Sequence, residues 1–96
     1  MAGPPLSRND RRHLREPRAQ QLFGKHASAA LDILELTELA WHDCYGEVTP
    51  PDDVLEDIFC CSEGDLPTLA RAARLAVEDF RDLRLWADDL RHAGRA

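Results

Sequence analysis

Residues 65–92 read DLPTLARAARLAVEDFRDLRLWADDLRH, the longest segment of the chain without a helix breaker after its first turn. Asp65 is a good helix cap, and Pro67 suits a first helical turn, where no amide partner is lost. Apolar side chains then recur at alternating spacings of three and four, as in a coiled coil or an antiparallel helix pair. This seam comprises Leu66, Leu69, Ala73, Ala76, Phe80, Leu83, Ala87 and Leu90. We therefore expect one long C-terminal helix over residues 65–92, about 40 Å long at ~1.5 Å per residue.

Two shorter helices are predicted before it. Ser28 can cap a helix over residues 27–45, which Gly46 ends, and a second helix follows over residues 50–61. The long helix should pack antiparallel to the first. Its C-terminal part would project from the body unless the two shorter helices lie end to end along it. The sequence thus predicts a small all-α, three-helix domain over residues 26–93.

The N-terminal residues 1–25 have a different character. They contain prolines and glycines among polar side chains with no sustained apolar period, so we expect a mostly disordered arm. Six basic and two acidic side chains give residues 1–30 a charge of +4, and since the whole chain carries −6, the remainder carries −10. Such an arm can bind nucleic acid or fold back onto an acidic surface. Its candidate phosphate-binding residues are Arg8, Arg11, Arg12, Arg15 and Arg18.

Apolar residues off the seam of the long helix indicate a second contact surface. Leu75, Leu85 and Trp86 lie on its flanking or opposite faces, and tryptophan is favoured at interface centres. We expect these residues to bind a protein partner or a second copy of the chain, with a homodimer as the preferred state. The sequence therefore favours a protein–protein interaction module, a small regulator or adaptor. The alternative is a nucleic-acid-associated protein that uses the arginines of residues 8–18.

Leu22 and Phe23 are the close apolar pair of the arm, and we expect them to contact the body or a partner. With the preceding glutamines, the segment Gln20-Gln21-Leu22-Phe23 resembles the peptide by which bacterial proteins dock onto the replication sliding clamp. Ala19 stands where that pattern has a glutamine. No function is carried over from this resemblance.

Candidate chemistry is sparse. The soft metal ligands are His42, Cys44, Cys60 and Cys61, which would suit a zinc or redox sensor if they converged. Neighbours on a helix point about 100° apart, so neither His42 and Cys44 nor the two adjacent cysteines face one site. There is no serine elbow, glycine-rich phosphate loop or HExxH helix. We expect neither an enzyme nor a bound metal or cofactor.

The composition bears on the compartment. With 44% hydrophobic and 31% charged residues the chain should be soluble and globular, and no apolar stretch approaches the ~18 residues of a membrane span. We expect a cytoplasmic protein with no membrane partner. Lys25 is the one lysine in an arginine-, alanine- and leucine-rich chain, a bias typical of a bacterium with a GC-rich genome.

Overall fold

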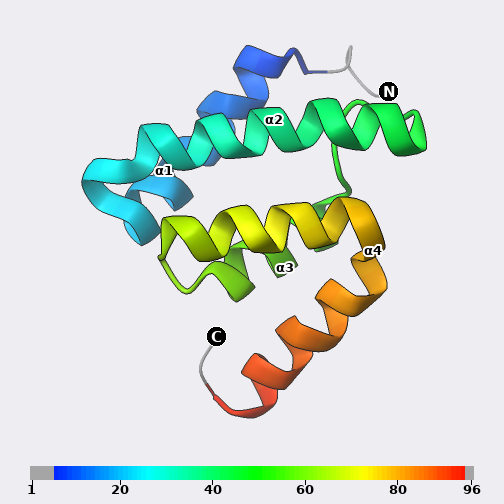
Figure 1. Ribbon diagram of the computed structural model, residues 1–96. Helices are drawn as coiled ribbons and strands as arrows, with labels where there is room; N and C mark the ends of the chain where they lie inside the picture. Colours follow the sequence, from blue (N-terminus) through cyan, green and yellow to red (C-terminus); the bar gives the residue numbers. More distant parts are fainter. Residues whose placement is uncertain (1–5, 95–96) are drawn as a thin grey trace, which may run out of the picture.

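A computed structural model describes residues 6–94, and within them every regular element is helical (Figure 1). The helices are α1 (Arg8–Phe23), α2 (Ala27–Tyr45), α3 (Asp52–Ser62) and α4 (Leu66–His92), with a short 3-10 turn at Gly24–His26. The all-α class and the long C-terminal helix are confirmed. The three expected helices are present, with ends within two residues of the predicted positions.

Helix α1 was not expected. Residues 1–5 of the predicted disordered arm lie outside the described residues, but from Arg8 to Phe23 the prediction of disorder is wrong. Ser7 caps the helix: its hydroxyl accepts from the amide of Asp10 at 3.1 Å, and the Asp10 carboxylate accepts from the amide of Ser7 at 3.3 Å. This capping box satisfies free amides at the helix start, and Pro17 is tolerated inside the helix.

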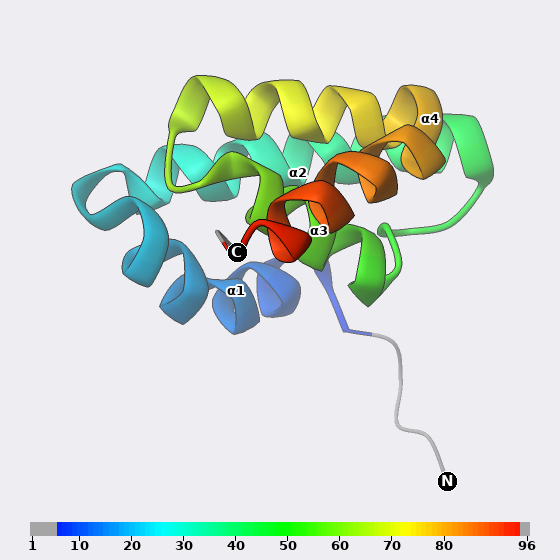
Figure 2. The same ribbon diagram turned by 90° about the horizontal axis from the view of Figure 1, so that it is seen from below.

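The order of the helices in space also differs from the prediction. Helix α2 and the first half of α4 lie side by side and run in the same direction (Figure 1). The Tyr45 hydroxyl, at the end of α2, donates to the carbonyl of Val77 at 2.8 Å. The predicted antiparallel pairing is therefore wrong. The cause is α3, which runs back after α2, so that α4 starts again in the original direction (Figure 2).

Helix α4 bends sharply at Asp79, whose backbone is extended (φ −160°, ψ 93°). The Asp79 carboxylate accepts from the amides of Arg81 at 3.0 Å and Asp82 at 3.4 Å, as an N-cap residue does. The second half of α4 is thus capped as a new helix and lies across α3 (Figure 2). It does not project, and the molecule measures 39 × 30 × 27 Å.

The core lies between α2, α3 and α4. Its large, fully buried apolar side chains are Leu34, Ile58, Leu69 and Leu83, each exposed by 1% or less. The end of α1 joins this core through Phe23. Gly64, after α3, lies so close to α1 that a Cβ there would stand 2.8 Å from the carbonyl oxygen of Leu22, so a side chain is excluded. No helix within residues 6–94 is long and apolar enough to cross a membrane.

Candidate functional site

A groove of about 710 Å³ with mostly apolar walls lies at the bend of α4, and we call it the kink groove. Its apolar walls are Trp41, Tyr45, Pro51, Val54, Phe80 and Leu85. Its charged rim consists of Glu47, Asp53, Arg81 and Arg84. The groove exists because α4 turns away from α2 at Asp79, next to the end of α2 (Figure 1).

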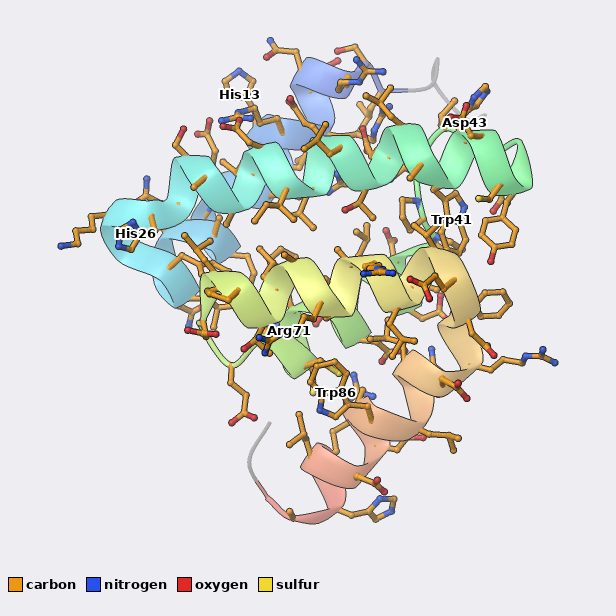
Figure 3. The ribbon with its side chains drawn as sticks, viewed as in Figure 1. His13, His26, Trp41, Asp43, Arg71 and Trp86 are labelled. Carbon is orange, nitrogen blue, oxygen red and sulfur yellow. The ribbon has the colours of Figure 1, made fainter. Side chains whose placement is uncertain are left out.

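Three aromatic rings form one wall of the kink groove. The Trp41 and Tyr45 ring centroids are 4.3 Å apart, and the Phe80 centroid lies 6.0 Å from each of them. The Tyr45–Phe80 pair meets edge to face, a favourable arrangement for two aromatic rings. Trp41 is buried and labelled in Figure 3, whereas Tyr45 and Phe80 are exposed. The rings therefore hold one another in place while two of them remain available to a partner.

The polar atoms of these rings have partners inside the chain. The Trp41 Nε1–H donates to Glu47 Oε1 at 3.0 Å, while the Tyr45 hydroxyl donates to a backbone carbonyl of α4. Contacts of the groove with a partner would therefore be mainly apolar. On the rim, Arg84 is paired with Asp53 at 2.9 Å, while Arg81 is largely exposed and lies 3.6 Å from Asp79.

The residues predicted to bind a partner do not form one surface. Leu85 is 64% exposed and lines the kink groove. Leu75 and Trp86 are partly buried against the core, and Trp86 projects toward the first half of α4 (Figure 3). The bend of α4 is the reason, because it turns the second half of the helix onto α3, where Trp86 packs against the core while Leu85 stays exposed. The aromatic wall was not predicted from the sequence. The i, i+4 spacing of Trp41 and Tyr45, which places both rings on one helix face, was the signal that could have indicated it.

Leu22 and Phe23 face the chain itself. Phe23 is 6% exposed and belongs to the core, and Leu22 packs against that core. Their expected contact with the body is present. A partner cannot reach the ring of Phe23 without detaching α1, so partner binding by Phe23 stays a prediction that requires α1 to move.

Three arginines of α1 converge on Glu38 of α2, which is 2% exposed. Arg11 donates to both carboxylate oxygens at 2.6 and 3.0 Å, Arg15 donates at 2.9 Å, and Arg8 lies at 4.0 Å. Burial alone would raise the pKa of Glu38, but hydrogen bonds from Arg11, Thr49 and Arg15 outweigh it, and the pKa is lowered. Glu38 is thus held as a buried anion.

The other two arginines of α1 also face carboxylates of the body. Arg12 pairs with Asp32 at 2.8 Å and with Glu35 at 3.4 Å, and its hydrogen bond to Asp32 raises its own pKa. Arg18 pairs with Glu56 of α3 at 2.9 Å. All five predicted phosphate-binding residues are therefore neutralised within the molecule. This is the fold-back onto the acidic surface that the charge distribution indicated.

The cysteines do not form a ligand cluster. Cys44 is exposed, Cys60 is half-buried and Cys61 is buried, and all three are free thiols. Burial raises the pKa of Cys61 to about 12 and also raises the pKa of Cys60, so both remain protonated and poorly nucleophilic near neutral pH. Among the described residues, no three His, Cys, Asp or Glu side chains lie close enough together to hold a metal ion.

Comparisons with known proteins add no family. No protein-family model matches the chain, and no characterised protein or solved structure matches it either.

Proposed function

We propose that this protein is a small cytoplasmic protein–protein interaction module that forms a homodimer through the kink groove. In the dimer, Leu85 of each copy enters the groove of the other copy. The observation that carries the proposal is the exposed leucine at the edge of an aromatic groove on the same face of the molecule.

The apolar character of the groove supports burial against a protein. Tyr45, Phe80 and Leu85 are all exposed large hydrophobic residues, and they gather in this one hollow. Fully burying one leucine side chain is worth roughly 1.5–3 kcal/mol. A symmetric contact buries two leucines and both aromatic walls, which suits the core of a homodimer interface.

The arrangement is also self-complementary. A two-fold interface uses the same patch on both copies, so the knob and the hollow it fills must lie next to each other. Leu85 and the aromatic wall meet that condition. The rim carries Arg81 on α4 and Glu47 on the α2–α3 connection. In the orientation that we propose, each Arg81 faces Glu47 of the other copy, so that opposite charges meet across the two-fold axis.

The state of the cysteines supports the cytoplasm as the compartment. Cys44, Cys60 and Cys61 are unpaired thiols. Disulfides form and persist in oxidising compartments, whereas thiols stay reduced in the cytosol.

Sedimentation equilibrium over a wide concentration range tests the dimer. The wild-type chain should dimerise reversibly, and Leu85→Glu should raise the dissociation constant by at least about tenfold. The matched control is Leu36→Glu, because Leu36 is 65% exposed and Leu85 64% exposed, but Leu36 lies outside the kink groove. A wild-type chain that stays monomeric at the highest concentration, or an equal effect of both substitutions, contradicts the proposal.

A charge exchange tests the orientation of the two copies. Arg81→Glu and Glu47→Arg should each weaken the homodimer through like-charge contacts across the two-fold axis. When the two variants are mixed, both contacts become attractive, so a heterodimer should form more tightly than either homodimer. Failure of the mixture to associate would reject this orientation while leaving the Leu85 test independent.

A further inference from the structure

The five arginines of α1 form a single charged face. They stand at spacings of three, one, three and three along residues 8–18, and each reaches a carboxylate of α2 or α3. Four carboxylates receive them: Asp32, Glu35, Glu38 and Glu56. The contact between α1 and the body is therefore a charge-complementary one along the whole arginine face.

This contact buries little apolar surface. No side chain between residues 8 and 18 is buried, and the buried residues of α1 are Ala19 and Phe23 near its end. Asp32, Glu35 and Glu56 are 66%, 33% and 55% exposed, and ion pairs with such partners contribute little net stability. At the buried Glu38, desolvation of the charges offsets much of their attraction. Residues 8–18 are thus held much less firmly than the segment that follows them.

The backbone of α1 allows this part to move separately. Pro17 has no amide hydrogen, so the carbonyl of His13 lacks its helical hydrogen bond, and the helix is weakened within its arginine-bearing turns. Gly24, which caps the end of the helix, has a positive φ of 53° and is the first residue of the 3-10 turn. The capping box at Ser7 and Asp10 is local to α1, so the released segment keeps its own helix cap.

We infer that α1 is a masked nucleic-acid-binding helix, whose arginine face leaves the carboxylates of the body for the phosphate backbone of a duplex. Guanidinium groups form forked hydrogen bonds with phosphates as they do with carboxylates. A duplex presents one negative charge per ~1.7 Å of its axis, a higher charge density than four carboxylates on two helices. The masking explains how an arginine-rich helix coexists with a body of opposite charge.

The chemistry of the face also defines the kind of binding. It carries arginines and no aromatic side chain, so it contacts backbone phosphates and does not stack on bases. Binding is therefore independent of sequence and weakens steeply with salt. This inference does not depend on the kink groove, because none of the α1 arginines lines it.

The test is an unmasked variant that carries Asp32→Asn, Glu35→Gln and Glu56→Gln and keeps the buried Glu38. A matched control carries Glu78→Gln, Asp82→Asn and Asp89→Asn, which change the net charge equally on exposed positions of α4. Anisotropy of a labelled, mixed-sequence DNA duplex at low salt should show binding about tenfold tighter for the unmasked variant than for the control. Equal binding by the two variants would overturn the inference.

Two further measurements assign the effect to α1 and to nucleic acid. Adding Arg12→Gln and Arg18→Gln to the unmasked variant should return its affinity to that of the control. Poly-glutamate, an acidic polypeptide, should bind the unmasked variant at least tenfold more weakly than the duplex does. Comparable binding of poly-glutamate, or no effect of the arginine substitutions, would reject nucleic acid as the ligand of this helix. Circular dichroism of every variant verifies that its helix content is unchanged.

Discussion

Two nearly fully buried carboxylates, Glu38 and Asp57, are 2% and 1% exposed, and arginines from a flanking helix hold each of them. Glu38 on α2 receives its arginines from α1, while Asp57 on α3 receives Arg84 and Arg91 from the second half of α4. The electrostatic part of the two contacts is therefore alike. Each joins an outer helix to the body by paired charges.

The apolar part of the two contacts is different. The second half of α4 buries Leu83, Ala87 and Leu90 alongside its arginines. Helix α1 buries Ala19 and Phe23 near its C-terminal end, and its arginine-bearing turns bury no apolar side chain. A buried ion pair is weak evidence for stability, because desolvation of the charges offsets their attraction. Core side chains therefore anchor the second half of α4, whereas the arginine-bearing turns of α1 depend on their charges.

The largest expected loss of stability comes from a substitution in the second half of α4. Leu83→Ala removes a side chain with no exposure and should cost about 3 kcal/mol of unfolding free energy. Urea unfolding followed by circular dichroism measures this loss. The control is Leu36→Ala, at a 65% exposed site, which should change stability by less than about 0.5 kcal/mol. Similar losses for both substitutions would contradict the assignment of Leu83 to the core.

The next largest loss of stability comes from a substitution at the contact between α1 and α2. Glu38→Gln removes the charge on which three arginines converge and should lower the free energy of unfolding by about 2 kcal/mol. This loss is smaller than that for breaking a fully buried ion pair, because Arg8 is already half-exposed. The loss should be local: hydrogen exchange of the amides of residues 8–18 should accelerate, whereas exchange of the second half of α4 should not.

The controls for this substitution come from the same two regions. Glu35→Gln removes a partly exposed partner of Arg12 and should cost less than about 1 kcal/mol. Asp57→Asn should accelerate exchange across α3 and α4, because that part of α4 belongs to the core. If Glu38→Gln accelerated exchange equally in α1 and α4, the two regions would not differ as we propose.

The sequence predicted helix ends well because caps and breakers act locally. Gly46 and Pro67 mark a helix end and a helix start whatever the rest of the chain does. Helix α1 could not be predicted in the same way, because its apolar pattern is weak and Pro17 looks like a breaker. Its attachment comes from Glu38, which stands 27 positions after Arg11. Such a pairing is visible only once the chain is folded.

The bend of α4 escaped prediction for a related reason. Asp79 caps the second half of the helix, but aspartate is also common on the exposed face of an unbroken helix, and the apolar period continues through it. The kink groove could not be predicted either, because it forms at this bend. Leu85 was recognised as an off-seam residue, whereas the convergence of Trp41, Tyr45 and Phe80 depends on where α4 turns.

The smallest expected effect is the pH dependence of the free energy of unfolding, which tests the charged contact of α1 without changing a core side chain. The pKa of Glu38 is lower in the folded chain than the value of about 4.3 that glutamate has when unfolded. A depressed pKa contributes stability that is complete above the unfolded pKa and disappears as the pH falls through the folded pKa. The wild-type chain should therefore keep its advantage over Glu38→Gln at neutral pH and lose it progressively below about pH 4.3. Urea unfolding of both proteins from neutral to strongly acid pH measures the difference, and carbon NMR of the Glu38 carboxyl gives its titration directly.

A Glu38 carboxyl that titrates above the unfolded value would mean that the effect of desolvation on its pKa exceeds the effect of the arginine contacts. In that case the charges of α1 would not hold the helix in place.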